Sequence, residues 1–199
     1  MQKTIVETIK RIVEKEAKLV REDKKKQFTF FVLGFVFAYL IVGFLFGLLG
    51  QEFYKQATGV PAEALASIVG LNTKSIGMAE CTENGFLWGE EKARCYSFMI
   101  SDKQVIISWL CTGMLEIIIL ISAIIASFGI AKDKKIKGIL AAIVLGFIFN
   151  QLRILITIII VASQPIGVVE LAHDLLFRIV LFVYITAFYV AWFYWAENK

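Results

Sequence analysis

Four long apolar runs constrain this 199-residue chain more than any other feature of its sequence. They lie at residues 28–50, 105–131, 138–161 and 171–196, and each exceeds the ~20 residues of helix that cross a bilayer. Hydrophobic residues make up 58% of the chain, more than is usual for a soluble domain. The sequence therefore predicts an all-α integral membrane protein built as a four-transmembrane-helix bundle.

The distribution of charge predicts the orientation of these spans. Residues 1–27 hold nine Lys or Arg, and the link 132–137 holds four lysines and one aspartate. Because basic flanks stay on the cytoplasmic side, we expect both segments and both termini to be cytoplasmic. The links 51–104 and 162–170 then lie outside the cell. Residues 1–27 lack the cleavage site of a secretory signal, so the first span is expected to remain as an anchor.

The segments outside the spans have patterns of their own. Apolar residues recur at helical spacing in residues 3–21, which predicts an amphipathic cytoplasmic helix, either on the membrane surface or packed in solvent against the bundle. The outer loop 51–104 predicts a short helix at 61–69 followed by a hairpin or small sheet, a small α+β unit. Its two cysteines, Cys81 and Cys95, are a candidate disulfide outside the cell, although three unrelated thiols would fit equally well.

Three residues that could perform chemistry fall at a similar membrane depth. Cys111 lies six residues inside the outer end of the second run, ~9 Å down, and Arg153 lies eight residues inside that of the third, ~12 Å down. His173, the only histidine, begins the fourth run. Since ionisable residues in membrane helices usually have a function, we expect these three to meet near the outer leaflet.

A small or polar stripe accompanies the arginine on the third run. It consists of residues that recur at helical spacing: Gly146, Asn150, Arg153 and Thr157. Such a stripe must face other helices or a wet cavity. An alternative is that Arg153 is structural, held by Asn150 and by Glu116. On a continuous helix, however, Glu116 is about 140° around from Cys111, so we expect it to support packing rather than join the thiol.

The three residue types suit acyl transfer. A nearby cation makes a cysteine more available as thiolate, so Cys111 could be a nucleophile. His173 could move protons, and Arg153 could stabilise an oxyanion. Asp174 and Arg178, four residues apart, are expected to pair with each other and to support the site. The absence of a CxxC motif disfavours a thiol–disulfide relay, and one histidine with one buried cysteine predicts no metal site. The sequence has no glycine-rich phosphate loop, and no cofactor is expected. Its basic residues do not interleave with aromatics as in proteins that bind nucleic acid.

These motifs resemble the exosortase/archaeosortase family of membrane transpeptidases. Cys111-Thr112-Gly113, Asn150-x-x-Arg153 and His173 occur in that order, and the likeness covers residues 94–199. The resemblance implies Cys111 as nucleophile with Arg153 and His173 as partners, and Arg178 as an alternative third residue. It implies cleavage of C-terminal sorting signals of secreted proteins (a motif, a membrane helix and a basic tail) and transfer to an acceptor, often a membrane lipid. Lys- and Ile-rich usage favours the archaeosortase branch.

Two other functions are compatible with the sequence. A membrane thiol redox protein would use Cys81, Cys95 and Cys111 with a quinone, and Cys111 would then form a reducible disulfide. A non-catalytic scaffold or transporter subunit would keep its function after Cys111→Ala.

Overall fold

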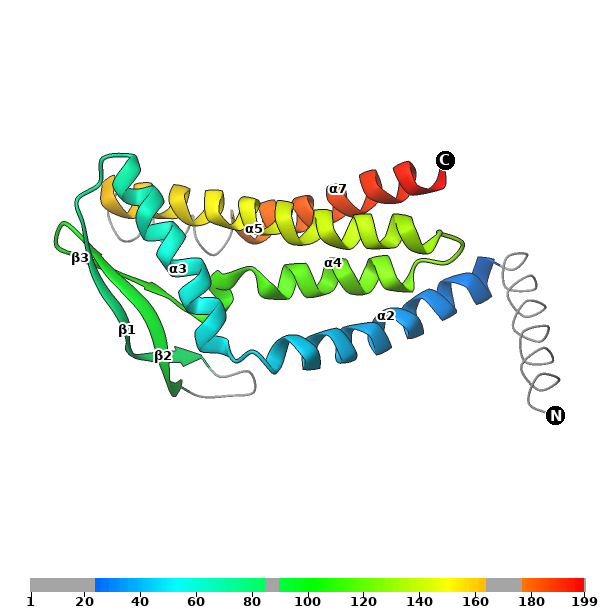
Figure 1. The fold of residues 1–199 in the computed structure, drawn as a ribbon, viewed down its shortest axis with the longest axis horizontal. Coiled ribbons are helices and arrows are strands. Elements are labelled where there is room, and N and C mark those ends of the chain that lie inside the picture. Colours follow the sequence, from blue (N-terminus) through cyan, green and yellow to red (C-terminus); the bar gives the residue numbers. More distant parts are fainter. Residues whose placement is uncertain (1–23, 85–89, 164–176, 199) are drawn as a thin grey trace.

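The computed structural model describes residues 24–84, 90–163 and 177–198. The elements follow in the order α2 (Lys24–Gly47), α3 (Gln51–Ile68), β1 (Thr73–Asn84), β2 (Glu90–Ile100), β3 (Lys103–Ile107), η1 (Trp109–Thr112), α4 (Met114–Ala126), α5 (Lys132–Ser163) and α7 (Phe177–Glu197). Long helices form one end of the molecule, and α3 with the three strands forms a cap at the other (Figure 1).

Three of the described helices are long and apolar enough to cross a membrane: Lys25–Gly47, Lys132–Ser163 and Ile179–Glu197. They correspond to the first, third and fourth apolar runs and indicate a membrane protein. Most of their large apolar side chains are exposed on the surface of the chain, where lipid can cover them.

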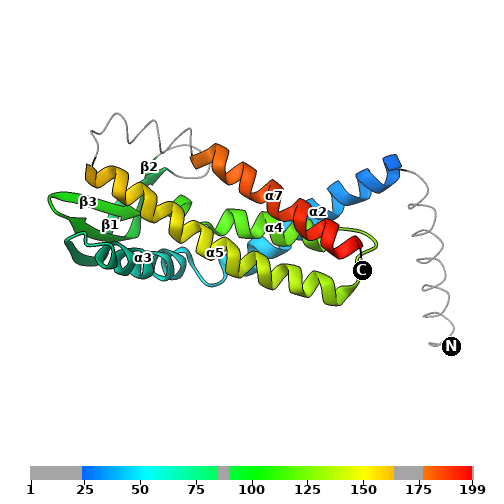
Figure 2. The same cartoon turned by 90° about the horizontal axis from the view of Figure 1, so that it is seen from above.

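Helix α4 packs against α2, α5 and α7 in the bundle (Figures 1 and 2). Nine of its 13 residues are buried. Two glycines allow neighbouring helices to approach α4 closely. A Cβ added to Gly34 of α2 would contact Ala126, and a Cβ added to Gly146 of α5 would contact Ile117. A helix that is apolar all round is typical of such a surrounded position.

The second apolar run is not one helix, which corrects the prediction of a continuous span at 105–131. Residues up to Ile107 form β3, which pairs antiparallel with β2 from Tyr96↔Ile107 to Ile100↔Lys103. The turn η1 follows, and α4 begins only at Met114. A helix of 13 residues is ~20 Å long, short of a ~30 Å hydrocarbon core. A short apolar run is compatible with a strand as well as with a helix, and here the pairing with β2 makes residues 105–107 part of a strand.

The other boundaries shift as well. Residues 132–137, predicted as a cytoplasmic loop, are the first residues of α5, and only 127–131 connect it to α4. Helix α2 begins at Lys24 and ends at Gly47, against the predicted 28–50. Residues 1–23 of the amphipathic segment, residues 164–170 of the outer loop and residues 171–176 of the fourth run lie outside the described residues.

The cap confirms a small α+β unit after the first apolar run, and it also takes in residues 105–107 of the second run. Its sheet has the order β1-β2-β3 with antiparallel pairs. Helix α3 runs through Pro61 and is longer than the predicted helix at 61–69. A disulfide joins Cys81 of β1 to Cys95 of β2, with their Cα atoms 5.8 Å apart.

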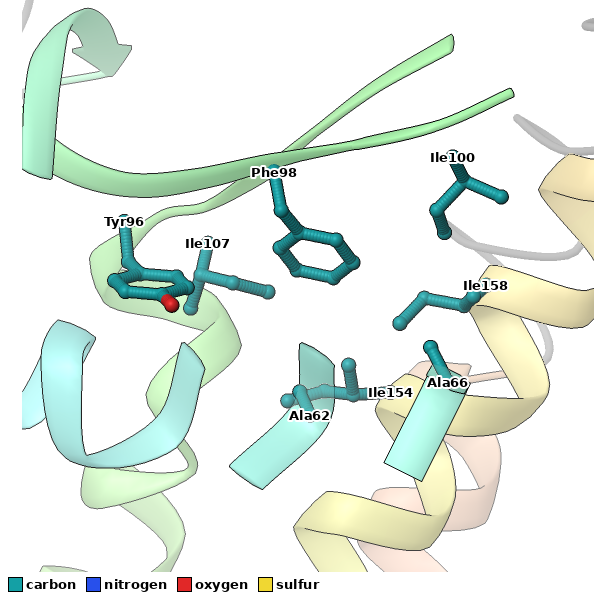
Figure 3. Packing of buried hydrophobic residues seen from close by; sticks show 8 residues of the cluster. All are labelled: Ala62, Ala66, Tyr96, Phe98, Ile100, Ile107, Ile154 and Ile158. Carbon is teal, nitrogen blue, oxygen red and sulfur yellow. The ribbon is translucent and has the colours of Figure 1, made fainter. Parts of the chain in front are cut away.

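One hydrophobic core joins the cap to the bundle. Figure 3 shows its buried residues, which come from α3, β2, β3 and α5: Ala62, Ala66, Tyr96, Phe98, Ile100, Ile107, Ile154 and Ile158. Because Ile154 and Ile158 belong to α5, the C-terminal part of this long helix packs in the cap rather than in the bundle. Arg153 therefore lies at the boundary between the two.

Basic residues gather at the opposite end. Lys134 Nζ donates to the Ala196 carbonyl at 2.6 Å, and Trp192 Nε1 donates to the Lys134 carbonyl at 3.3 Å. The start of α5 therefore lies beside the end of α7. Helix α2 starts here too, since the ring of Phe30 contacts the ring of Phe128, just beyond α4, edge to face.

Candidate functional site

Cys111 lies on the turn η1, at the junction of cap and bundle. The turn closes through the backbone N–H of Cys111, which donates to the Ser108 carbonyl at 3.0 Å, and through Thr112 Oγ1, which donates to the Trp109 carbonyl at 2.7 Å. The Cys111 side chain is half-buried against the cap core and is not part of a disulfide. Its Sγ lies 3.4 Å from Ser108 Oγ. A thiol with partial access at a rigid turn is a suitable position for a nucleophile.

Gly113 ends this turn and begins α4. Its φ of 72° and ψ of 9° place it in the left-handed region, where glycine is strongly favoured. A Cβ at this position would lie 2.7 Å from Cγ of Asn150. The glycine thus permits both the turn from η1 into α4 and the close approach of α5.

Two residues of α5 hold the backbone of Cys111. Asn150 is buried, and its Nδ2 donates to the Cys111 carbonyl at 2.9 Å. Arg153 Nη2 reaches the carbonyls of Leu110 at 3.4 Å and Cys111 at 3.5 Å. Thr157 Oγ1 donates to the Arg153 carbonyl at 2.9 Å, one turn further along α5. The structure thus brings Arg153 to the turn of Cys111, as their shared depth predicts, together with Asn150 of the polar stripe.

Glu116 pairs with Arg153, as the structural alternative drawn from the sequence predicts. Its Oε1 is 3.9 Å from Arg153 Nη1, and the two side chains are only 12% and 14% exposed. The expected separation of about 140° assumed a continuous helix through Cys111. Because Gly113 breaks the helix, the residues before and after it are not related by helical spacing. Glu116 and the Cys111 carbonyl therefore both contact Arg153.

The electrostatics of this cluster favour a developing negative charge near the turn. The N-terminus of α4, which follows Gly113, carries the positive end of the helix dipole, worth roughly half an elementary charge. The Arg153 guanidinium adds a full positive charge, which Glu116 balances in part.

Three residues of the predicted site cannot be placed in it. His173 and Asp174 lie outside the described residues, and the side chain of Arg178, in the first turn of α7, is not described either. The assignments of His173 as base and of Asp174 and Arg178 as supporting residues stay predictions. Among the described residues, no three His, Cys, Asp or Glu side chains lie close enough to hold a metal ion.

Two polar residues near the site were missed by sequence reasoning. Ser108 contacts the thiol, and the signal was its position three residues before Cys111, a one-turn spacing. Gln151 is buried on α5, and its Nε2 donates to the Thr58 carbonyl of α3 at 3.3 Å. The sequence feature that could have revealed Gln151 is its position next to Asn150, which makes two adjacent polar residues in an apolar run. Gln151 ties the cap to the helix that carries Asn150 and Arg153.

No family model, curated protein or solved structure matches this chain. Its function must therefore be inferred from the site and from the sequence motifs.

Proposed function

We propose that this chain is a membrane cysteine transpeptidase that cleaves C-terminal sorting signals of secreted proteins. It transfers the new C-terminus to an acceptor, with a membrane lipid as the expected class. One observation carries the proposal: the turn that bears the Cys111 thiol is held by Asn150 and Arg153 at the start of α4. The order of these residues in the chain resembles the exosortase/archaeosortase family, and archaeosortases in particular.

The chemistry proceeds through a thioester. The Cys111 thiolate attacks the carbonyl carbon of the scissile peptide bond, and the tetrahedral oxyanion is stabilised by the Arg153 guanidinium. His173 takes the thiol proton and returns it to the leaving amine. The acceptor then attacks the thioester and regenerates the thiol. No cofactor takes part.

In the proposed topology four segments pass through the membrane: α2, α5 and α7 as full-length helices, and η1 with the shorter α4 as the fourth. Both termini are cytoplasmic, and the cap lies outside. The support is the collection of lysines where α2 and α5 begin and α7 ends, because basic residues stay on the cytoplasmic side. Arg153 is 16 residues beyond Lys137, or ~24 Å along the helix. With a hydrocarbon core of ~30 Å, this places Arg153 and Cys111 near the outer leaflet. A substrate that emerges there would meet the thiol as it leaves the bilayer.

A structural role for Arg153 is the strongest competing interpretation. The guanidinium has a carboxylate and two carbonyls as partners within the chain, which is what a buried structural arginine requires. A scaffold or transporter subunit would satisfy the same contacts, and it would not need the thiol.

Replacement of the thiol separates these functions. Cys111→Ala and Cys111→Ser would be coexpressed with a candidate substrate, and the enzyme would be analysed by gel shift and mass spectrometry. We expect cleavage to be abolished in the alanine variant and to be nearly as poor in the serine variant, since a hydroxyl ionises far less readily. The matched control is the double variant Cys81→Ser/Cys95→Ser, which removes two cysteines and leaves the site. Processing that continues in Cys111→Ala would contradict the catalytic role.

A further inference from the structure

Glu116 has a buried carboxylate oxygen that the fold leaves unused. The residue is 9% exposed, and Oε1 faces Arg153 Nη1. The other oxygen, Oε2, is buried and has no hydrogen-bond partner among the described residues. A buried carboxylate oxygen normally accepts a hydrogen bond, so an orphaned one in a native fold points to a missing donor.

The orphaned oxygen is connected through Arg153 to the turn that carries the thiol. Glu116 is the third residue of α4, and Cys111 lies on the turn just before that helix. Arg153 connects them, since one of its terminal nitrogens faces Glu116 and the other reaches the Cys111 carbonyl. A molecule at the thiol that carries an N–H or O–H group could therefore supply the donor that Oε2 lacks.

We infer that Glu116 is the general base for the acceptor, and that the acceptor attacks through a neutral hydroxyl or amine rather than an anionic oxygen. This inference rests on the proposed function. In the second half-reaction the acceptor oxygen or nitrogen bonds to the thioester carbonyl carbon, and its proton passes to Glu116 Oε2. The C–S bond then breaks, the ester or amide product leaves, and the departing thiolate takes the proton back from Glu116. Atoms and charge balance with no further reactant.

The charge of the carboxylate selects the class of acceptor. An ionised phosphate oxygen has no proton to donate, and a phosphate anion would be repelled by the Glu116 carboxylate. A hydroxyl or amine gains a hydrogen bond with Oε2 and becomes a better nucleophile as its proton moves. Such groups occur on lipid headgroups and on soluble molecules. The inference therefore concerns a hydroxyl or amine acceptor, and the experiment distinguishes its two sources.

The experiment measures formation and loss of the thioester separately. Full-length wild type, Glu116→Gln and Glu116→Asp would be incubated in detergent with a candidate substrate, and the adduct on Cys111 would be followed by mass spectrometry. Acceptors would then be added in separate arms: phosphatidylethanolamine vesicles, phosphatidylglycerol vesicles, soluble ethanolamine, soluble glycerol, and inorganic phosphate. The matched control is Ser122→Ala, a buried polar residue of α4 whose Oγ bonds only the Ile118 carbonyl among the described residues.

We expect Glu116→Gln to form the adduct at close to the wild-type rate and to lose it ~10²-fold more slowly or worse, the usual contribution of a general base. Glu116→Asp should recover part of the rate, and Ser122→Ala should behave as wild type. Hydroxylamine needs no base, so it should release the adduct equally fast from all variants. Phosphate should be inactive, and a faster reaction from vesicles than from soluble acceptors would identify the source as lipid.

Several results would overturn the inference. Loss of the adduct from Glu116→Gln at the wild-type rate would remove the role of base. Equal slowing of adduct formation and of hydroxylamine release would assign Glu116 a purely structural role through Arg153. Transfer to phosphate would refute the acceptor class. If the wild type forms no adduct at all, the proposed function fails, and the inference fails with it.

Discussion

Replacement of Gly113 by alanine tests the geometry of the site most directly. The residue has a φ of 72°, and a Cβ there would lie 2.7 Å from Asn150 Cγ and 3.0 Å from Asn150 Oδ1. Two costs follow. The left-handed conformation costs an L-residue roughly 1–2 kcal/mol. Asn150 must also move, which breaks its bond to the Cys111 carbonyl and leaves a buried amide unsatisfied, at about 1–3 kcal/mol.

The expected total is about 2–5 kcal/mol of destabilisation. For a chain of this length 1 kcal/mol shifts the melting temperature by roughly 2–4 °C, so Gly113→Ala should lower it by about 4–20 °C. Gly70→Ala is the matched control, because Gly70 has a φ of 87° and the described part of the chain leaves open space within 4 Å of where its Cβ would stand. That variant should show the conformational cost alone, about 2–8 °C.

The assay is thermal unfolding of the purified protein in detergent micelles, followed by tryptophan fluorescence. A double-mutant cycle with Asn150→Ala isolates the clash, since this change removes two of the three atoms nearest to the Gly113 Cβ position. We expect Gly113→Ala to cost less in the Asn150→Ala background than in the wild type. If Gly113→Ala is no more harmful than Gly70→Ala, or if the two changes are additive, the close approach of α5 to the turn is wrong.

Three further predictions concern the arginine, the disulfide and the topology. Arg153→Lys should lower the rate of adduct formation ~10²–10³-fold, because lysine cannot hold the Cys111 carbonyl and Glu116 with one planar fork; near-normal processing would make Arg153 structural. The disulfide should protect Cys81 and Cys95, so alkylation without reductant should label Cys111 alone. Three labelled thiols in the intact mass would rule the bridge out. The chain-entropy model gives such a bridge a stabilisation of ~3 kcal/mol. A cysteine in place of the exposed Lys132 should resist an impermeant reagent added outside intact cells, and rapid labelling would reverse the proposed orientation.

The apolar composition of the chain by itself determined its class. Runs longer than ~20 apolar residues produce helices that lipid can cover, and three of the four appear as such helices. Alternation and turn residues in 51–104 were enough to predict a hairpin or small sheet, and the periodic stripe on α5 predicted that Asn150 and Arg153 face inward. These features depend on local pattern, which sequence carries directly.

The tertiary structure decided the site. Residues 105–107 are as apolar as the helix that follows, and their pairing with residues 96–98 of the neighbouring strand β2 makes them part of β3. That pairing lets Gly113 break the run, so Cys111 lies on a turn and Glu116 comes to face Arg153. Helical spacing had separated Glu116 from the thiol because it assumed one continuous helix. Contacts between distant segments carry the energy of such a choice, and a local pattern cannot record them.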